Sequence, residues 1–502
     1  MKTLELDFDD TTVLTLELDF DVPKVSITQR LGGTLTAEQM TETARQWQTE
    51  CFSKWIGLDN PRGTLKAGTG AGKTRLGIMV MMNWLKERED ATVIFVVPSL
   101  ALGNQTKNSL RAWGLTTGRY FTGFKETAPH KNVYITTYTS LNKLVEAVPY
   151  LKNRNVLLVL DECHKAGASQ ALRNLRNFKG DGCLMLSATP ERGDGVNVMA
   201  ELDAPLFFEL TLIDGIKQSR TADDALDYTF HVVFVQPNQQ EAIEYDDLSE
   251  SISKMFHMCV AEGKKVGANT NNLFDRRNLG YGGEFAQKLR IYTALCRSRK
   301  RLENELESRY QATQDILTYT YGKKTAVFNQ SIFAIERLNG MVKDMGIHPR
   351  VYHSGLSSLP ADALEMYPEL NNQGFKRRLE QWGDDADKEL KRWVRSSSDV
   401  LLTCKALQEG FDCPDMDTLI MANGTNAIRS RIQTIGRVFR GSKHKDIFML
   451  VHNNGSDDTG DMNAFYRLIH ATGIEHDKIR YHTNGINPAH ITVPEDTGGI
   501  NQ

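Results

Sequence analysis

The sequence has no paired cysteines, no long apolar run and no strong charge of either sign. Its seven cysteines are scattered without a Cys-x-x-Cys pair, at Cys51, Cys163, Cys183, Cys259, Cys296, Cys404 and Cys413. This odd number without framework spacing predicts reduced thiols and no zinc site. No apolar run approaches the roughly 18–20 residues of a membrane span. The first five residues lack the basic and apolar regions of a secretory signal, so we expect a cytoplasmic protein.

The net charge is only −3, so composition does not indicate a nucleic-acid binder, and a basic surface would have to be local. With 40% hydrophobic and 25% charged residues, the composition is that of a globular protein. At 502 residues the chain is too long for one ordinary core. Two or three domains are therefore expected.

The N-terminal segment is acidic and internally repeated. The sequence TLELDF at residues 3–8 recurs at residues 15–20, and apolar and acidic residues alternate within each copy. Alternation of this kind predicts two strands of a β-hairpin around residues 9–12. Residues 1–24 carry seven acids and two lysines. We interpret the segment as a solvated edge hairpin; the alternative is an acidic flap that competes with nucleic acid for a basic groove.

Two successive α/β series follow. Apolar, β-branched runs of the first lie at residues 93–97, 133–137, 156–160 and 184–187, with a helix expected at 75–89; those of the second lie at 325–329, 350–353, 400–404, 418–422 and 447–451. Continuous runs of this type are typical of buried parallel strands. The fold class is therefore predicted as α/β, with two tandem doubly wound parallel-sheet domains.

The remaining segments complete the expected domain organisation. We predict an acidic hairpin extension at 1–30, a first domain at 31–215, a mostly helical insert at 216–320, a second domain at 321–460 and a solvated tail at 461–502. The insert contains a basic cluster at 297–301, which is either a duplex-binding patch or a solvated helix face. At the spacing of Trp382 and Trp393 beside a basic helix, packing is favoured over a strand-separating wedge.

A small-residue loop that ends in Lys-Thr predicts a phosphate site. The loop residues are Gly68, Thr69, Gly70, Ala71 and Gly72, followed by Lys73 and Thr74. Glycines allow backbone N–H groups to approach phosphate oxygens at a helix N-terminus. Lys73 can reach the β- and γ-phosphates, and the Thr74 hydroxyl can ligate Mg²⁺. Ala67 stands where the phosphate-loop pattern usually begins with glycine.

An apolar run that ends in two carboxylates predicts the second half of this site. Asp161 follows the run at 156–160, which places it at the carboxyl end of a strand, where doubly wound sheets bind ligands. It could hold Mg²⁺ through water. Glu162 could orient or deprotonate the attacking water. Together the two segments predict a chain that binds and hydrolyses ATP with Mg²⁺.

Seven further segments accompany these two in a fixed order. They lie at residues 45–48, 98–105, 136–138, 187–190, 328–330, 407–414 and 433–440. With the Lys73 loop and the Asp-Glu-Cys-His box at 161–164, they resemble the motif set of superfamily 2 helicases of the DEAD/DEAH-like group. The resemblance covers about residues 45–441 and implies two RecA-like domains.

The resemblance also implies roles for individual residues. Arg45 and Gln48 would recognise adenine, and Gly410 and Asp412 would contact the nucleotide from the second domain. Ser187, Ala188 and Thr189 would couple hydrolysis to domain movement. The catalytic set would be Lys73, Asp161, Glu162, Gln433, Arg437 and Arg440. We expect Arg437 and Arg440 to act as arginine fingers from a loop or first helical turn.

Nucleic-acid contacts are expected from Pro98, Ser99, Gln105, Thr137, Arg192 and Thr403. For the hydroxyl residues, ordinary strand-end roles are the alternative. The sequence SATPERGDG at 187–195 resembles the branch with restriction-motor, XPB-like, RadD-like and phage UvsW-like enzymes, and Gln433 stands where RNA-dedicated DEAD-box proteins have His. Both favour DNA, with a bacterial or phage-infected cell as the setting. An RNA helicase and a slow ATP-gated nucleic-acid clamp remain alternatives.

Overall fold

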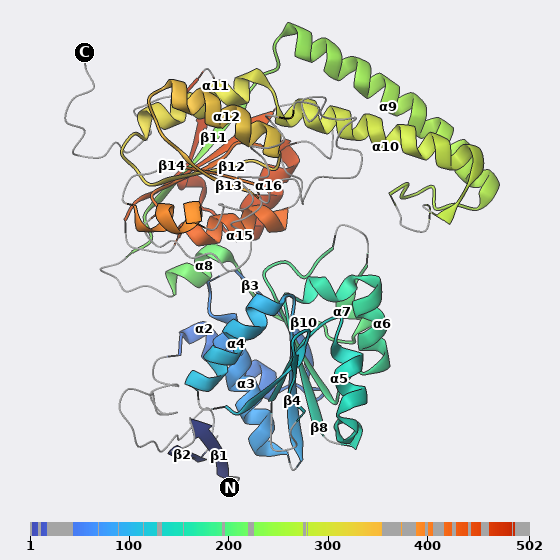
Figure 1. Cartoon of the computed structure of the whole chain (residues 1–502), viewed down its shortest axis with the longest axis vertical. Helices are drawn as coiled ribbons and strands as arrows, with labels where there is room; N and C mark the ends of the chain where they lie inside the picture. Colours follow the sequence, from blue (N-terminus) through green and yellow to red (C-terminus); the bar gives the residue numbers. More distant parts are fainter. Residues whose placement is uncertain are drawn as a thin grey trace. The chain divides into compact units, whose positions relative to one another are not determined.

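The computed structural model contains two compact units (Figure 1). One holds Met1–Ala225 with Ala471–Gly473, and the other holds Leu226–His470 with Ile474–Gln502. The structure describes residues 3–8, 12–17, 44–68, 70–88, 90–113, 115–127, 133–153, 155–192, 196–218, 225–274, 278, 280–353, 373, 388–396, 400–404, 416–423, 428–439, 443–452, 461–483 and 485–486. Across these ranges no helix has the length and apolar character needed to cross a membrane.

The first unit is built on an eight-stranded sheet in the order β10-β3-β9-β8-β4-β7-β5-β6. Its strands are β3 (Arg62–Ala67), β4 (Ala91–Val97), β5 (Thr117–Phe121), β6 (Phe124–Lys125), β7 (Val133–Thr137), β8 (Asn155–Asp161), β9 (Gly182–Ser187) and β10 (Leu206–Leu210). All neighbours are parallel except β5 and β6. The four runs predicted for this domain are confirmed as β4, β7, β8 and β9.

Helices cover both faces of this sheet, as its continuous apolar strands predict. They are α2 (Gln46–Ile56), α3 (Lys73–Glu87), α4 (Leu100–Ala112), α5 (Leu141–Ala147), α6 (Ser169–Asn177), α7 (Val198–Glu201) and α8 (Leu212–Lys217). Along β4, Val93, Phe95 and Val97 belong to one buried cluster, while Ile94 and Val96 belong to another. The two clusters lie on opposite faces because successive strand side chains alternate.

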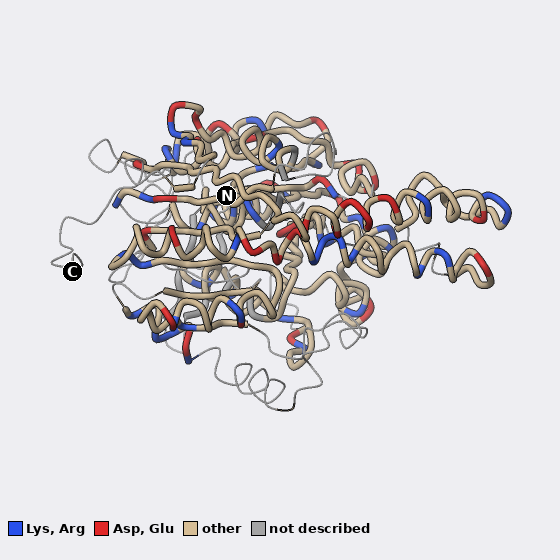
Figure 2. The backbone as a smooth tube through the Cα atoms, turned by 90° about the horizontal axis from the view of Figure 1, so that it is seen from above, with Lys and Arg blue, Asp and Glu red and all other residues tan. Residues whose placement is uncertain are grey.

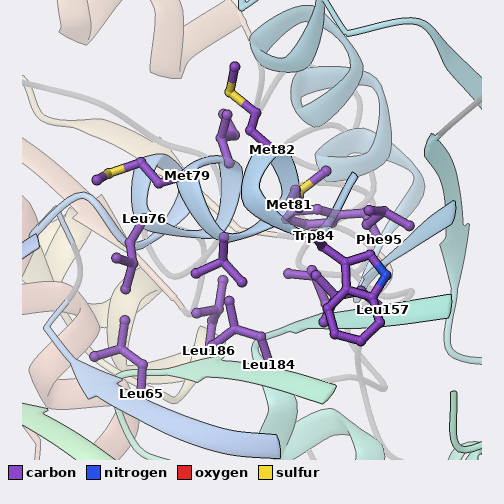
Figure 3. Packing of buried hydrophobic residues seen from close by; sticks show 14 of the residues in the cluster. Leu65, Leu76, Met79, Met81, Met82, Trp84, Phe95, Leu157, Leu184 and Leu186 are labelled. Carbon is purple, nitrogen blue, oxygen red and sulfur yellow. The ribbon is translucent and has the colours of Figure 1, made fainter. Parts of the chain in front are cut away.

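Helix α3 is anchored to the sheet by apolar side chains. Leu76 points toward Leu65 of β3, and Trp84 lies beside Leu157 of β8 (Figure 3). Trp84 also donates from Nε1 to the Asn155 carbonyl, 3.0 Å away. Burying a large apolar side chain is worth about 1.5–3 kcal/mol. The start of α3 is therefore held firmly against the edge of the sheet where β3 ends.

The second unit contains a seven-stranded sheet in the order β13-β14-β12-β15-β16-β11-β17, with every neighbouring pair parallel. Its strands are β11 (Tyr228–Val235), β12 (Thr325–Phe328), β13 (Arg350–Tyr352), β14 (Val400–Thr403), β15 (Thr418–Met421), β16 (Lys445–His452) and β17 (Ile479–His482). Helices α11 (Glu307–Tyr319) and α12 (Ile332–Asp344) pack on one face. Helices α15 (Ile428–Val438) and α16 (Asp461–Thr472) complete the described part of the unit. Two parallel-sheet α/β domains are thereby confirmed.

The predicted domain boundaries differ from those observed. β11 lies inside the expected insert at 216–320, yet it pairs with β16 along its whole length. α11, at the end of the same range, contributes Tyr310 and Ile316 to the core of the second unit. The expected tail at 461–502 contains α16 and β17, of which β17 pairs with β11. The second unit therefore begins near Leu226 and includes part of the expected tail.

Two long helices form the part of this range that is an insertion. α9 (Gln239–Val266) and α10 (Gly283–Asn304) run side by side and project from the second sheet domain (Figure 1). At the base, a carboxylate oxygen of Glu241 accepts from the Glu307 backbone N–H at 2.9 Å. The Tyr245 ring lies edge-on to His452, with centroids 5.6 Å apart. We call this pair of helices the α9–α10 hairpin.

The N-terminal hairpin is present, with a shifted second strand. β1 (Thr3–Phe8) pairs antiparallel with β2 (Thr12–Glu17), and Leu4 lies opposite Leu16. The second copy of the repeat was expected to form the strand from residue 15. The strand begins at Thr12 instead, because a short connection brings Thr12 opposite Phe8. Among the described residues, this two-stranded sheet joins neither parallel sheet.

A buried charged network lies in the second sheet. One carboxylate oxygen of Asp446 on β16 lies 3.0 Å from His231 Nε2, and the other lies 2.7 Å from Lys323 Nζ. His444 Nε2 lies 3.3 Å from the first oxygen. Its Nδ1 lies 2.8 Å from Asp227. His231, Lys323 and His444 hold the pKa of Asp446 well below its usual range despite burial.

Candidate active site

The phosphate loop leaves the carboxyl end of β3 and turns into α3. Gly70 and Gly72 both have positive φ, at +84° and +100°, which glycine adopts without strain. A Cβ on Gly72 would lie 2.7 Å from Gln48 Nε2, and one on Gly68 would lie 2.8 Å from the Leu212 backbone. Glycine is therefore required sterically at 68, where the close contact is with backbone, and is favoured at 72 by its positive φ. Ala67 is fully buried at the end of β3, where its small side chain is accommodated.

Lys73 begins α3 and folds back over the loop. Its Nζ donates to the carbonyls of Ala67 at 3.0 Å and Gly68 at 3.2 Å. Loop carbonyls thus hold the ammonium group at the position where a phosphate-binding lysine is needed. Thr74 lies in the first turn of α3, so it is at the same end of the helix as Lys73. Thr69 lies outside the described residues.

Arg45 and Gln48 lie against this loop, at the start of α2. Gln48 accepts from the Arg45 backbone N–H at 2.9 Å and donates to the Gly72 carbonyl at 3.0 Å. The Arg45 guanidinium donates to the carbonyls of Gly70, at 3.2 Å, and Ala71. The structure therefore brings both residues to the phosphate loop, and their role in adenine recognition remains a prediction.

The two carboxylates occupy the predicted strand end. Asp161 is the last residue of β8, and Glu162 follows in the left-handed region with φ +48°. This conformation is uncommon for a residue other than glycine and is frequent at functional sites. Burial and the Glu162 carboxylate raise the pKa of Asp161 to about 6, while the Lys73 ammonium acts in the opposite direction. Lys73 and the carboxylates therefore share one electrostatic environment.

Sheet order explains how these distant segments meet. β3 pairs with β9, and β9 pairs with β8, all in parallel. The phosphate loop, Ser187 and Asp161 consequently leave the sheet at the same carboxyl edge. Glycines with positive φ, an ammonium group, a hydroxyl and two carboxylates fit a triphosphate with Mg²⁺. Within the described residues this edge therefore has the donor set that such a ligand requires.

Two further residues connect to the carboxylates and were missing from the predicted set. His164 Nδ1 lies 3.3 Å from Glu162 Oε2 and 3.4 Å from Ser187 Oγ. The Tyr138 hydroxyl donates to the Asp161 carbonyl at 2.7 Å. His164 could have been found from the Asp-Glu-Cys-His box. Tyr138 ends the motif segment at 136–138, but its contact with Asp161 depends on the fold, which brings the end of β7 to this position.

The segment at residues 187–189, which we expect to couple hydrolysis to domain movement, begins directly beside His164. Ser187 ends β9 and is fully buried, and its Oγ accepts from the Thr189 backbone N–H at 3.1 Å. Ala188 and Thr189 are also buried. Arg192, expected at nucleic acid, donates to the His164 carbonyl instead. A phosphate contact by Arg192 would compete with that bond.

Three expected nucleic-acid residues have local structural roles. Ser99 caps α4, accepting from the Leu102 backbone N–H at 3.4 Å, with Pro98 beside it after β4. The Thr137 hydroxyl contacts Thr139 and Ser140 at 3.2 and 3.1 Å. Thr403 is fully buried at the end of β14. Gln105 lies on α4, and its side chain is outside the described part of the chain.

The second-domain residues are described only in part. Gln433 lies within α15, and Arg437 lies in its last turn and is buried. The expected position on a loop or first helical turn is therefore wrong for Arg437, because α15 begins at Ile428 and ends at Val438. Gly410, Asp412, Arg440 and Trp382 lie outside the described residues.

The structure favours the alternatives without DNA contact for the basic cluster at 297–301 and for Trp393. Lys300 and Arg301 pair with Glu303 and Glu305 at 2.8 and 3.1 Å, which favours the solvated helix face. Trp393 is fully buried, with Lys324 Nζ 5.2 Å from its ring centroid. Packing is thus the observed role of this tryptophan.

Two family models match the chain. The model described as "Type III restriction enzyme, res subunit" matches residues 41–192, and the "Helicase conserved C-terminal domain" matches residues 382–442. The first match spans the phosphate loop and the carboxylate pair. The second includes the segment that holds Gln433 and Arg437.

Curated relatives are similar at low identity. A "DNA 3'-5' translocase XPB2" of Sulfurisphaera tokodaii is 20% identical over 415 residues, covering 82% of this chain and 82% of that protein. An "ATP-dependent DNA helicase MPH1" of Coccidioides immitis is 29% identical over 205 residues, covering 37% of this chain and 17% of that protein. A "Probable helicase A859L" of African swine fever virus is 21% identical over 474 residues, with coverages of 86% and 43%. The chain thus spans less than half of the last two relatives.

Solved structures share the fold. The helicase domain of Hef from Pyrococcus furiosus aligns with a TM-score of 0.51 at 14% identity, covering 85% of this chain and 98% of that one. A fragment of a putative HsdR subunit of a type I restriction enzyme from Vibrio vulnificus aligns with a TM-score of 0.52 at 14% identity, with coverages of 95% and 79%. At these identities the likeness concerns the fold alone.

Proposed function

We propose that the chain, a superfamily 2 helicase or translocase that hydrolyses ATP, couples this hydrolysis to movement on, or remodelling of, duplex or branched DNA. Its substrates would be forks, R-loops or recombination junctions in DNA repair, recombination or replication. The observation that carries the proposal is the shared edge of Lys73, Asp161, Glu162 and Ser187 in the first sheet.

Each residue at that edge has a task in phosphoryl transfer. Lys73 would exchange its two loop carbonyls for the β- and γ-phosphate oxygens of ATP. Thr74 and Asp161 would hold Mg²⁺, which neutralises phosphate charge when it is bound. Glu162 would orient or deprotonate the attacking water. Most of the catalysis would then come from positioning and charge neutralisation.

We place the rest of the site on the second domain. Arg437 and Arg440 would neutralise charge on the transferred phosphoryl group, and Gln433, Gly410 and Asp412 would support them. An arginine finger is worth about 10³–10⁵ in turnover number where it has been measured. The phosphate loop and Arg437 belong to different units, and we propose that opening and closing of the two domains during the ATP cycle moves the DNA.

DNA is proposed over RNA for two reasons. Gln433 and the SATPERGDG segment resemble DNA-acting members of the superfamily. The similar XPB2 and MPH1 proteins are named as a DNA translocase and a DNA helicase. Contacts would be mainly to phosphates, so we expect binding that depends little on sequence and strongly on salt.

The test compares ATP hydrolysis with blunt duplex DNA, forked DNA, single strands and RNA. We expect stimulation by duplex or forked DNA, and no turnover in the Lys73→Ala variant with any of them. Stimulation by RNA alone would overturn the DNA assignment. Slow hydrolysis that no nucleic acid accelerates would indicate the ATP-gated clamp. Strand displacement on four-way junctions and simple duplexes would then separate branch migration from unwinding.

A further inference from the structure

The outer half of the α9–α10 hairpin exposes an aromatic cluster. Phe274, in the connection between the helices, is 60% exposed, and Phe256 on α9 is 38% exposed. The Tyr292 ring of α10 lies between them, with centroids 5.7 Å from Phe274 and 6.0 Å from Phe256. Three elements therefore direct rings to one place. We call Phe256, Phe274 and Tyr292 the tip cluster.

The connection that carries Phe274 is held in place by its neighbours. Asn278 is buried, and its Nδ2 donates to the carbonyls of Asn269 at 2.9 Å and Asn272 at 3.2 Å. Its side-chain oxygen accepts from the Asn269 backbone N–H at 3.0 Å. Leu273, next to Phe274, is buried with Phe285 and Leu289. Leu273 is thus buried, while the next residue, Phe274, is exposed.

Charge around the tip cluster indicates the kind of partner. The described residues between 254 and 292 include five Lys or Arg and two Glu. On the basal part of α9, residues 239–253 include five Asp or Glu and no basic residue. The facing basal part of α10 carries Arg297, Arg299, Lys300 and Arg301, so both signs of charge occur at the base (Figure 2). Lys264 and Arg290 are exposed and form no ion pair with a described residue.

We propose that the tip cluster stacks unpaired bases of the DNA substrate, so that the α9–α10 hairpin recognises the single-stranded part of a fork or junction. Exposed aromatic rings beside positive charge suit a base with its phosphates, because every base has a stacking face. A protein partner or a second copy of the chain would fit the rings less well with the surplus of positive charge. The inference rests on the proposed DNA-dependent function and adds a substrate-recognition site to it.

The test uses the full chain with Phe256→Ala and Phe274→Ala combined. Binding to a fork with unpaired arms should weaken roughly tenfold or more, because stacking is lost. Binding to blunt duplex should change less than about twofold. A 2-aminopurine base at the first unpaired position should be quenched by the wild type and not by the double variant. The double Tyr variant keeps both rings and should behave as the wild type.

Ile243→Ala is the matched control, since Ile243 is 58% exposed on the basal part of α9. It should leave fork binding unchanged. Three results would each overturn the proposal. The double Ala variant could bind the fork as tightly as the wild type, or lose as much affinity for blunt duplex as for the fork. It could also change from dimer to monomer in sedimentation. Fork binding is measured without ATP. If no DNA stimulates hydrolysis by the wild type, the proposed function is contradicted. The fork-binding test can still be interpreted in that case, because it does not depend on hydrolysis.

Discussion

His164 Nδ1 lies 3.3 Å from Glu162 Oε2 and 3.4 Å from Ser187 Oγ, so one buried imidazole contacts both the proposed catalytic carboxylate and the end of β9. β8 and β9 are hydrogen-bonded neighbours. A movement of the segment after Ser187 could therefore reach Glu162 through the ring. This relationship offers a physical route for the coupling role that we predict for residues 187–189.

Removing the imidazole of His164 should remove the side-chain contact that connects Glu162 with Ser187. We expect His164→Ala to lower the turnover number by on the order of 100-fold, because Glu162 loses the group that orients it. The KM for ATP should change little, since His164 does not contact the phosphate loop in the described structure. DNA stimulation should fall more than basal hydrolysis. A parallel fall in ATP affinity would instead indicate a folding defect.

Glu162→Gln tests the carboxylate itself. The amide keeps the size of the side chain but cannot accept a proton, so hydrolysis should fall by about 10²- to 10⁴-fold. ATP binding, measured with a fluorescent analogue, should persist. Glu201→Gln is the control, because Glu201 forms an exposed ion pair with Arg176 outside the site. Wild-type turnover in the Glu162 variant would refute its role.

Gly72→Ala tests the fit between Gln48 and the phosphate loop. The added Cβ would lie 2.7 Å from Gln48 Nε2, so the side chain must move. We expect a large loss of ATP affinity in a titration with the analogue. Gly123→Ala controls for backbone strain, because Gly123 has φ +87° and open space around it. Both changes should cost about 1–2 kcal/mol of stability through strain, and only the first should affect ATP.

Four strands of the first sheet, β4, β7, β8 and β9, were predictable because each is a continuous run of apolar or β-branched residues, whereas β3 (RGTLKA) and β5 (TGRYF) interrupt such a run with glycine and charged residues. The run at 156–160 and its two acids identify both β8 and the site at its end. β17 was missed because its four residues form no apolar run: Ile479 and His482 are buried, and Arg480 and Tyr481 between them are exposed. β11 is apolar, but its surroundings are polar and helical. Contacts such as Tyr138 with Asp161 depend on strand order, which no local pattern specifies.

Removal of residues 1–24 tests the acidic segment. For a solvated edge hairpin that makes no contact with the DNA site, we expect DNA affinity at low salt to stay within about twofold of the full chain. Low salt is used because screening is weakest there, so that a charge close to the site would change the affinity. Both parallel sheets should persist, since β1 and β2 pair only with each other among the described strands. A marked rise in affinity would instead support the flap, because the segment carries a net charge of −5.

Asp446→Asn should destabilise the second domain. The change leaves Lys323 and His231 without their buried carboxylate, which typically costs about 3–5 kcal/mol. Hydrogen exchange of β11 and β16 amides should report this loss, because those strands belong to the second domain alone. Unchanged protection of both strands would show that the network contributes little to stability. Glu250→Gln is the control, since Glu250 forms an exposed ion pair with Lys254 on α9.

The same network predicts how stability changes with pH. The folded pKa of Asp446 is depressed, so its contribution is present above the ordinary carboxyl pKa of about 4 and is lost as pH falls below it. The pKa of His444 is raised, chiefly by its hydrogen bond to Asp446, so its contribution is present below about 6.5 and is lost as pH rises through the folded value. Protection of β16 amides, corrected for intrinsic exchange, should therefore be greatest between about pH 4.5 and 6.5. In Asp446→Asn this maximum should flatten, because both shifts depend on the carboxylate, and an unchanged pH profile would assign it to other groups.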